Sequence, residues 1–325
     1  MAKVKNFKTI FPAVSVPLND DYSINESEFR AYLRWIKTFY GKGMDGLVCN
    51  GHTGEITGLT RAERKRVVEI CAEECGDVMT IISGVNCENT AESIEMAKEA
   101  KEAGADGILL MPPHMWLRFG MNPDTPFEYV KDVAEGADID IIIHLYPATS
   151  KAFYPVETLI KMCKEIDHVK CIKMGTRVTS IYEHDVRLLR QECPDISLIT
   201  CHDETLCVSW FPGMDGALIG FAGCVPEIIC PAREVFANPD KHTLKEAQDW
   251  SDRIYHISQA IYGGGQPSGE AHARLKEALK QRGIFSSALM RKPVLPLNQE
   301  EKDWVALGLE RSQLPEVDMT QFEDK

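Results

Sequence analysis

Residues 104–111 read Gly104-Ala105-Asp106-Gly107-Ile108-Leu109-Leu110-Met111, and this stretch carries the pattern that decides the fold. Its first glycine can take the left-handed conformation that ends a helix, and its second lets the chain enter a sheet closely. The apolar residues after Gly107 are typical of a strand buried on both faces of a parallel sheet. Because Gly-x-Asp-Gly recurs at residues 43–46 and 213–216, the sequence predicts a series of helix-to-strand units.

Strand-like runs recur along the chain, with amphipathic stretches between them. Eight runs are nearly continuously apolar: Ile10–Pro17, Gly46–Asn50, Thr80–Val85, Gly107–Met111, Ile139–Leu145, Val169–Met174, Leu198–His202 and Gly216–Phe221. They follow one another at intervals of about 25 to 35 residues, which fits one strand, one helix and two short loops. Thr60 and Asn89 are each followed three residues later by a glutamate, the spacing of a capping box. They predict helices over Arg61–Glu74 and Ala91–Ala103.

Eight strand-and-helix units in one chain predict a closed (β/α)8 TIM barrel over residues 1–238, with an open doubly wound sheet as the alternative. After Asn238 the pattern changes, and no strand-like run of useful length follows. The helical stretches there are His242–Ile261, Glu270–Arg282 and Gln299–Leu307. We therefore expect residues 239–325 to form a C-terminal helical region that is too poor in motifs to carry chemistry alone.

Charge and composition argue against several classes of protein. The 325 residues include 49 acidic and 36 basic side chains, a formal net charge of −13, whereas a nucleic-acid binder needs a basic surface. No apolar run approaches the ~20 residues that span a bilayer, and the first residues lack the apolar core of a secretory signal. The 11 cysteines form no Cys-x-x-Cys pair, so we expect them to be reduced and mostly buried. We expect a cytoplasmic protein that binds neither nucleic acid nor membrane.

Reactive side chains gather where the strands end, which is where barrels of this kind build their active sites. The histidines at strand ends are His52, His114, His144 and His202. Lys173 lies inside the sixth apolar run, where burial penalises the ammonium and lowers its pKa. The neutral amine can then attack a carbonyl carbon and form a Schiff base. The alternative is a structural lysine paired with a carboxylate at the barrel mouth.

The turn Gly51-His52-Thr53-Gly54-Glu55 lies between a predicted strand and a predicted helix. Its backbone N–H groups and the Thr53 hydroxyl can hold an anion. Tight-turn geometry explains the two glycines equally well. The turn is not a phosphate-binding P-loop, because no Gly-Lys-Ser/Thr follows. Glu55 is expected to support the turn rather than to act as a catalytic base.

Taken together, these pieces resemble the dihydrodipicolinate synthase / N-acetylneuraminate lyase family of class I aldolases. The matching pieces are Gly51-x-Thr53-Gly54-Glu55 with Leu59-Thr60, Ala103-Gly104-Ala105-Asp106-Gly107, Lys173, Gly213-x-Asp215-Gly216 and Arg291-x-Pro293. The resemblance extends from Phe11 to about Leu297 and implies a (β/α)8 barrel with C-terminal helices, assembled as a homotetramer or homodimer. It also implies that Lys173 forms a Schiff base with pyruvate or another 2-oxo acid, whose carboxylate would bind at Gly51 to Gly54.

The departures from the family bear on the substrate. The family usually has Tyr-Asn-x-Pro after the fifth strand, with the tyrosine as proton shuttle, whereas this chain has His144-Leu145-Tyr146-Pro147. True dihydrodipicolinate synthases have threonine where this chain has His52 and tyrosine where it has His114. Their carboxylate-binding arginine is also missing after Pro147. We therefore expect a divergent member rather than a synthase of the lysine pathway.

Histidine titrates near neutral pH, so His144 can take over the movement of protons to and from the substrate. Tyr146, two residues away, is an alternative source of a phenol on the same face. Two other interpretations of the four strand-end histidines stay open. Three or four imidazoles can form a zinc site, and single histidines can simply hydrogen-bond to loop backbone.

The sequence therefore predicts a lyase of the class I aldolase type that acts on a pyruvate-like 2-oxo acid, with Lys173 and His144 as catalytic residues. The expected substrate contacts are Gly51, His52, Thr53, Gly54, His114, His202 and Ile219. No cofactor and no metal are expected. The alternatives are a 2-keto-3-deoxy sugar acid dehydratase using the same Schiff base, a non-catalytic 2-oxo-acid-binding protein, and a metal-dependent hydrolase using the histidines.

Overall fold

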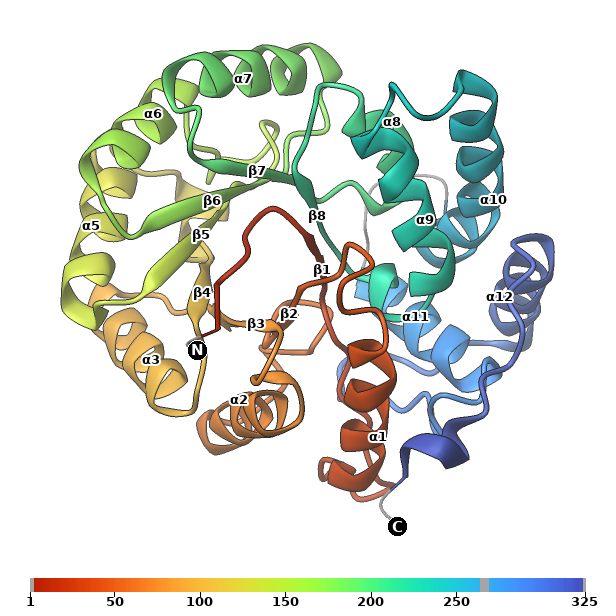
Figure 1. Cartoon of the computed structure of the whole chain (residues 1–325). Helices are drawn as coiled ribbons and strands as arrows, with labels where there is room; N and C mark the ends of the chain where they lie inside the picture. Colours follow the sequence, from red (N-terminus) through yellow and green to blue (C-terminus); the bar gives the residue numbers. More distant parts are fainter. Residues whose placement is uncertain (1–2, 264–268, 324–325) are drawn as a thin grey trace.

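Eight parallel strands form a barrel in the computed structural model, which describes residues 3–263 and 269–323 (Figure 1). The strands are β1 Ile10–Pro12, β2 Gly46–Cys49, β3 Thr80–Val85, β4 Gly107–Leu110, β5 Asp140–His144, β6 Val169–Met174, β7 Ser197–Thr200 and β8 Gly216–Ile219. They pair in sequence order, and β1 pairs with β8. A parallel bridge between Ala13 and Val48 joins the end of β1 to β2. The predicted TIM barrel is confirmed, and the open sheet is excluded.

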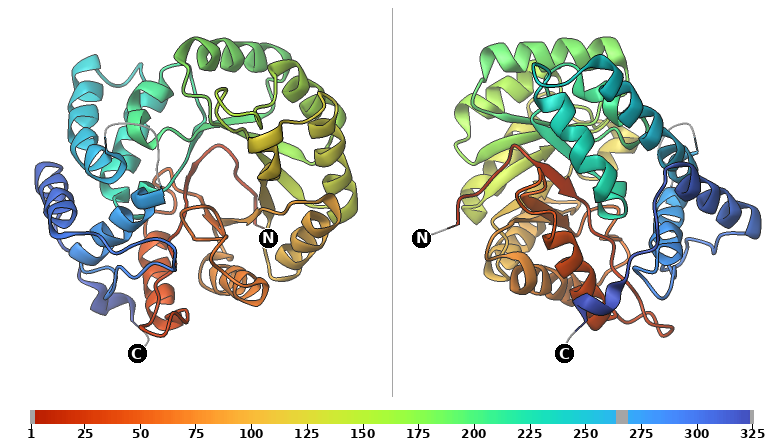
Figure 2. Two further views of the ribbon diagram at one scale, coloured as in Figure 1. Left: turned by 180° about the vertical axis from the view of Figure 1, so that it is seen from behind. Right: turned by 45° about the vertical axis from the view of Figure 1, so that its right-hand side comes forward.

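The helices lie around the barrel and beside it (Figures 1 and 2). They are α1 Glu26–Lys37, α2 Arg61–Cys75, α3 Thr90–Glu102, α4 Met115–Phe119, α5 Thr125–Ala137, α6 Val156–Glu165, α7 Thr179–Glu192, α8 Leu206–Trp210, α9 Pro226–Ala237, α10 Leu244–Tyr262, α11 Gly269–Gln281 and α12 Gln299–Arg311. Short 3-10 helices cover η1 Asp203–Thr205, η2 Phe221–Gly223 and η3 Met319–Phe322. The helices α10, α11 and α12 gather on one side of the barrel.

Local sequence signals explain several helix and strand boundaries. Thr60 and Glu63 form the predicted capping box at the start of α2. At α3 only half of the predicted box is present, because Asn89 accepts the Glu92 N–H and no reciprocal bond from the Glu92 side chain accompanies it. The first glycine of each Gly-x-Asp-Gly repeat has a positive φ, as predicted: 95° at Gly43, 103° at Gly104 and 87° at Gly213.

The core has two layers because side chains alternate across each strand. The inner layer takes one buried residue from every strand: Phe11, Val48, Ile82, Leu109, Ile142, Cys171, Ile199 and Leu218. The neighbouring strand residues point outward and pack against the helices in a larger cluster. Residues two positions further along a strand point into the barrel again, above the inner layer. Lys173 follows Cys171 and His144 follows Ile142 at this spacing.

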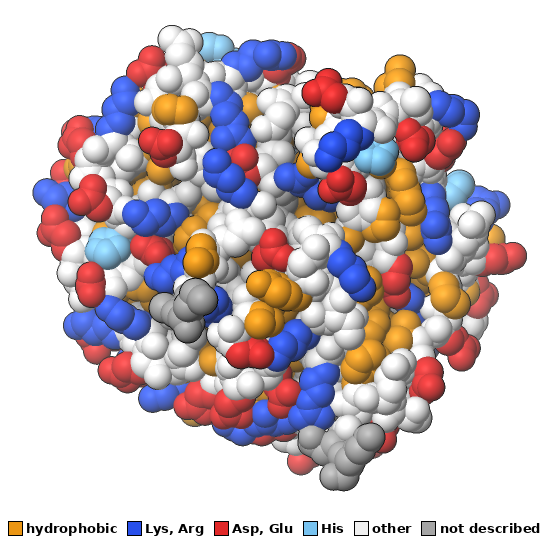
Figure 3. Space-filling view, viewed as in Figure 1, with side chains coloured by type: hydrophobic (Ala, Val, Ile, Leu, Met, Phe, Trp, Pro, Cys, Tyr) orange, Lys and Arg blue, Asp and Glu red, His pale blue; other side chains and the backbone are white. Residues whose placement is uncertain are grey.

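The surface mixes charges of both signs. Figure 3 shows Lys and Arg side chains interspersed with Asp and Glu over the face that it presents. Among the described residues, no helix has the length and apolar character needed to cross a membrane. All eleven cysteines are free thiols and nine of them are buried, which fits the prediction that they fill the core.

Candidate active site

A cavity of about 270 Å³ opens at the C-terminal ends of the strands. It is lined by Ala13, Gly51, His52, Thr53, Leu109, His144, Leu145, Tyr146, Pro147, Lys173, Gly175, Arg177, Cys201, Asp203, Leu218, Gly220, Tyr262 and His272. The floor is apolar, because Leu109 and Leu218 belong to the inner layer of the core. The polar groups stand above this floor, where the strands end. The cavity thus combines a dry base with a few convergent polar side chains, as ligand sites commonly do.

Lys173 and His144 are register partners on β6 and β5. Because both follow an inner-layer residue by two positions, their side chains project into the same cavity. Burial lowers the pKa of Lys173, and the positive charge of Arg177 lowers it further, whereas the charges of Cys201 and Asp203 act the other way. Within residues 3–263 and 269–323, no hydrogen bond or ion pair holds Lys173 Nζ. The alternative of a lysine paired with a carboxylate is therefore not observed there.

Four aromatic side chains form a cluster beside Lys173. The ring centroid of His52 lies 5.7 Å from that of His144 and 6.0 Å from that of His114. The Tyr146 hydroxyl lies 3.3 Å from Nε2 of both His52 and His114. Tyr146 thus joins the histidines, as the alternative in the sequence suggested, and its ring packs against His144 with centroids 4.9 Å apart.

Two of these histidines are held neutral by their surroundings. Burial, followed by the charge of Lys173, lowers the pKa of His52 to about 3 and that of His144 well below its usual value. The His144 Nδ1 atom is buried and has no hydrogen-bond partner among the described residues. The pKa of His144 therefore lies below the near-neutral value expected from the sequence, and the unengaged nitrogen of its neutral ring is the atom that can accept a proton from a bound substrate.

The turn after β2 lines the cavity with Gly51, His52 and Thr53. Among the described residues, the N–H groups of His52, Thr53 and Gly54 have no acceptor, an arrangement that favours an anion. The buried Thr53 hydroxyl faces Gly220, where a Cβ atom would lie 2.9 Å from Thr53 Oγ1 and 2.8 Å from the Tyr262 hydroxyl. Only a glycine at position 220 leaves both hydroxyls access to the cavity.

Glu55 supports this turn from behind. It has a φ of 55°, and its carboxylate accepts the Arg291 N–H at 3.0 Å and forms an ion pair with Lys276 of α11. These contacts anchor the turn to the C-terminal region, so the expected supporting role of Glu55 agrees with its position.

Asp203, Tyr262 and His272 are polar lining residues that were not among the predicted site residues. Asp203 Oδ1 accepts hydrogen bonds from the Tyr262 hydroxyl at 2.7 Å and from the Gly220 N–H at 2.8 Å. Burial raises the pKa of Asp203 to about 6, although the bond from Tyr262 lowers it. Tyr262 and His272 come from α10 and α11. The sequence interpretation overlooked both because it gave the C-terminal helices no part in the site.

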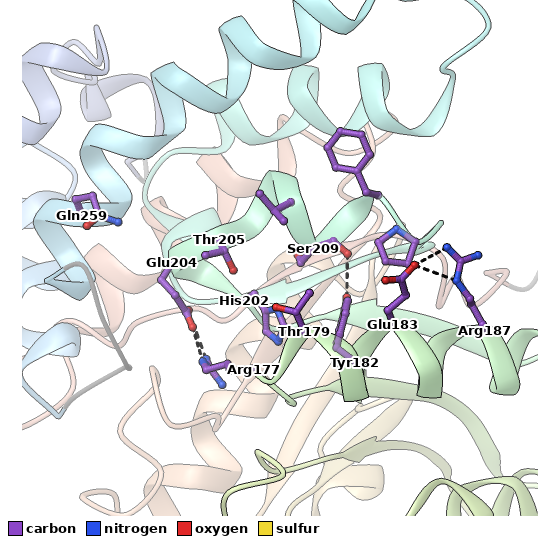
Figure 4. Close-up of a pocket in the computed structure, with 13 residues that line it drawn as sticks. Arg177, Thr179, Tyr182, Glu183, Arg187, His202, Glu204, Thr205, Ser209 and Gln259 are labelled. Carbon is purple, nitrogen blue, oxygen red and sulfur yellow. Dashed lines mark hydrogen bonds and ion pairs between the residues drawn. The ribbon is translucent and has the colours of Figure 1, made fainter.

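Four predicted substrate contacts do not line the Lys173 cavity: Gly54, His114, His202 and Ile219. His202 lines a neighbouring cavity of about 680 Å³, packs against Tyr182 and leaves its buried Nε2 without a partner among the described residues (Figure 4). It points away because its neighbours Cys201 and Asp203 face Lys173. Ile219 points outward into the helix-facing core, and Leu218 lines the cavity instead. His114 is not a lining residue but contacts Tyr146 and Asn86.

The histidines do not form a recognisable metal centre. In the described ranges, no group of three or more His, Cys, Asp or Glu side chains is arranged to hold a metal ion. His202 is separated from the other three, so the predicted convergence of four imidazoles is not observed. The expectation that the site needs neither metal nor cofactor stays a prediction.

Comparisons with known proteins agree with this architecture. The model of the dihydrodipicolinate synthetase family matches residues 6–311. The 4-hydroxy-tetrahydrodipicolinate synthase of Bartonella bacilliformis is 26% identical over 309 residues, covering 94% of this chain and 98% of that protein. An uncharacterized DapA-like lyase of Thermofilum pendens is 25% identical over 292 residues, covering 89% of this chain and 92% of that protein.

Solved structures share the fold at lower identity. YagE, a prophage protein of E. coli K12 from the dihydrodipicolinic acid synthase family, was solved in complex with pyruvate and superposes with a TM-score of 0.84 at 20% identity. That match covers 95% of this chain and 99% of the other. A monomeric dihydrodipicolinate synthase variant superposes with a TM-score of 0.83 at 19% identity, covering 95% and 97% of the two chains. The identities fit a divergent member with the same fold.

Proposed function

The chain belongs to the dihydrodipicolinate synthetase family, and from this premise we propose that it is a class I aldolase whose Lys173 forms a Schiff base with pyruvate or a related 2-oxo acid. The reaction is the cleavage or formation of a C–C bond next to that adduct. The observation that carries the proposal is a buried lysine amine that no described carboxylate pairs, beside a neutral His144 on the adjoining strand. The complex of YagE with pyruvate supports the choice of oxo acid.

The residues divide the steps between them. The turn donors of His52, Thr53 and Gly54 bind the substrate carboxylate, which places the 2-oxo carbon at Lys173. The neutral Nζ attacks this carbon, the carbonyl oxygen leaves as water, and a protonated imine forms. His144 carries protons between nitrogen and oxygen during this exchange. In cleavage, the imine accepts the electrons of the C3–C4 bond while His144 removes the proton of the C4 hydroxyl, which leaves an enamine and releases the aldehyde. His144 then returns its proton to C3 of the enamine, and hydrolysis of the resulting imine releases pyruvate.

Two alternatives use the same cavity. A 2-keto-3-deoxy sugar acid dehydratase would form the same Schiff base and break a C–O bond in place of a C–C bond. A non-catalytic 2-oxo-acid-binding protein would use the turn donors without an adduct. His52 and His144 favour an enzyme, because both are neutral groups placed to move protons. A cytoplasmic location and a homotetrameric or homodimeric assembly remain part of this proposal.

Borohydride trapping tests the proposal directly. The protein is incubated with pyruvate, reduced with sodium borohydride, digested and mapped by mass spectrometry. We expect the reduced pyruvyl adduct on the peptide that contains Lys173 and on no other lysine peptide. Absence of an adduct with pyruvate and with a panel of other 2-oxo acids would overturn the Schiff-base mechanism. Saturable binding of these acids without an adduct would identify a binding protein.

A further inference from the structure

Arg177 stands where two cavities meet. It follows β6 and lines both the Lys173 cavity and the larger cavity that contains His202 (Figure 4). Its side chain is only 15% exposed. The residues of the 201–204 segment alternate across this boundary, so that Cys201 and Asp203 face Lys173 while His202 and Glu204 face the larger cavity. Arg177 is the one side chain that lines both cavities among the described residues.

In the described part of the chain, the Lys173 cavity is lined by two basic side chains and by one acidic side chain, Asp203. Of the described residues that line it, Lys173 and Arg177 are the only lysine or arginine side chains. Lys173 is committed to the 2-oxo carbon in the proposed function. Arg177 is therefore the permanent positive charge of the cavity, because a guanidinium stays protonated at any working pH.

The guanidinium is held in place without using all of its hydrogens. Its Nε donates to Glu204, Nη1 donates to the Gly175 carbonyl at 3.1 Å, and Nη2 lies 3.5 Å from both the Cys201 carbonyl and Glu204 Oε2. A guanidinium has five N–H donors, so at least one Nη1 hydrogen remains for a ligand. These contacts fix the plane of the Arg177 guanidinium, so it can bind a carboxylate in one defined orientation.

A single carboxylate at the turn after β2 does not account for Arg177. In the order of the eight strands, four positions separate β2 from β6 in either direction around the barrel. The turn donors at His52 to Gly54 and the guanidinium of Arg177 therefore stand on opposite sides of the mouth. A ligand that uses both needs an anionic group near each end.

We propose that Arg177 binds a second carboxylate of the substrate, at the end remote from the 2-oxo group. The substrate class is then a 2-oxo acid with a distal carboxylate, oriented from the turn after β2 across Lys173 toward the junction of the two cavities. This inference rests on the proposed function, which supplies the position of the 2-oxo carbon. The larger cavity leaves room for the part of the substrate's carbon chain that lies next to the distal carboxylate.

Matched acids of two lengths test the proposal. Calorimetry measures the affinity of the full chain for 2-oxoglutarate and 2-oxoadipate, each against the acid of equal length that ends in a methyl group, 2-oxovalerate and 2-oxohexanoate. We expect a preference of about 10-fold or more for the dicarboxylate at one length or both. Arg177→Gln should remove the preference and leave the methyl-ended acids within about 3-fold, and Arg177→Lys should retain part of it.

Arg187 provides the matched control. It lines only the larger cavity, pairs with Glu183 and is 68% exposed, so Arg187→Gln should leave the preference intact. The proposal would be overturned if the unmodified protein bound the dicarboxylate no more tightly than the methyl-ended acid at either length. It would also be overturned if folded Arg177→Gln lost affinity equally for both kinds of acid. The same loss in Arg187→Gln would also overturn it. Borohydride trapping of the same acids separates the two claims, since a missing adduct with the preference intact contradicts only the Schiff base.

Discussion

Two lysines of this protein, Lys276 and Lys173, differ in what faces their amines. Lys276 on α11 is 1% exposed, and its Nζ donates to the Leu289 carbonyl at 2.8 Å and pairs with Glu55. Lys173 on β6 also has an amine in a buried setting, but no partner holds it among the described residues. Burial lowers the pKa of both side chains. The partners, rather than the burial, distinguish the two sites.

The difference separates a lysine held in an ion pair from the lysine to which we assign the proposed chemistry. Glu55 opposes the effect of burial at Lys276 and favours its charged form, which ties α11 to the turn after β2. At Lys173 burial lowers the pKa, Cys201 and Asp203 act against burial without pairing with the amine, and Arg177 adds to the effect of burial, so the neutral amine is favoured. Variants of each lysine and of its neighbours can break or sharpen this comparison.

Lys173→Met should produce the largest effect. We expect it to abolish the borohydride adduct and to slow exchange of the pyruvate methyl protons with D2O, followed by NMR, by a factor on the order of 10³ or more. It should not destabilise the protein at neutral pH. A lysine whose pKa is lowered in the folded protein takes up a proton on unfolding. It therefore destabilises the folded protein below the pKa of the unfolded state, and this cost disappears as the pH rises above that pKa.

Lys170→Met on the same strand is the matched control, because that side chain is exposed. It should leave adduct and exchange unchanged. Full exchange activity in Lys173→Met would contradict the assignment of the nucleophile.

Lys276→Met should act on stability in place of chemistry. Removing one partner of a buried ion pair leaves Glu55, which is 8% exposed, without its counter-charge, and such losses are typically about 3 to 5 kcal/mol. Denaturant unfolding measures the change, and Glu55→Gln in the same chain should recover part of it. Lys280→Met, an exposed position on the same helix, should stay within about 0.5 kcal/mol. A neutral effect of Lys276→Met would show that the two lysines are not distinguished by their partners.

His144→Gln should slow pyruvate proton exchange by a factor of about 10², the usual contribution of a positioned acid–base group. The adduct on Lys173 should still form on long incubation, because the nucleophile is retained. His168→Gln serves as the control, since His168 precedes β6 at the N-terminal end of the strands. Unchanged exchange in His144→Gln would move the proton transfer to another group, with Tyr146 as the first candidate.

Asp203→Asn should give the smallest effect, a shift of the pH profile by less than about one unit. The Asp203 carboxylate raises the pKa of Lys173, so its loss should lower that pKa and move adduct formation with cyanoborohydride to lower pH. The two profiles should converge below about pH 6, where Asp203 itself becomes protonated. Asp185→Asn is a fitting control, because the pKa of this carboxyl is also raised to about 6 and its charge does not act on Lys173. A shift to higher pH would contradict the assigned sign.

Sequence alone could predict the barrel and two side chains, Lys173 and His144, that share one cavity in it. Each apolar run corresponds to an observed strand, although β1 stops at Pro12 where the run reaches Pro17. The fixed geometry of parallel strands placed Lys173 and His144 in one cavity, since both stand at strand ends. Local patterns of this kind depend on neighbouring residues, and for that reason they can be found without the structure.

The rest of the site depends on contacts between distant segments. Tyr262 and His272 reach the cavity from helices that have no motif of their own. The side-chain directions of His202 and Ile219 follow from strand alternation, which a single residue shift reverses. Arg177 is an ordinary arginine in the sequence, and only the fold places it at the junction of two cavities.

The contribution of α10 and α11 to the cavity wall also sets an order in time. Translation produces all eight strands, with Lys173 and His144, before it produces Tyr262 and His272. A chain that has formed its barrel during synthesis still lacks one side of the pocket, and the turn after β2 still lacks Lys276 behind Glu55. The Lys173 amine therefore acquires these surroundings only after α11 has been synthesised. The wall of the cavity is completed by residues that are made after every strand of the barrel.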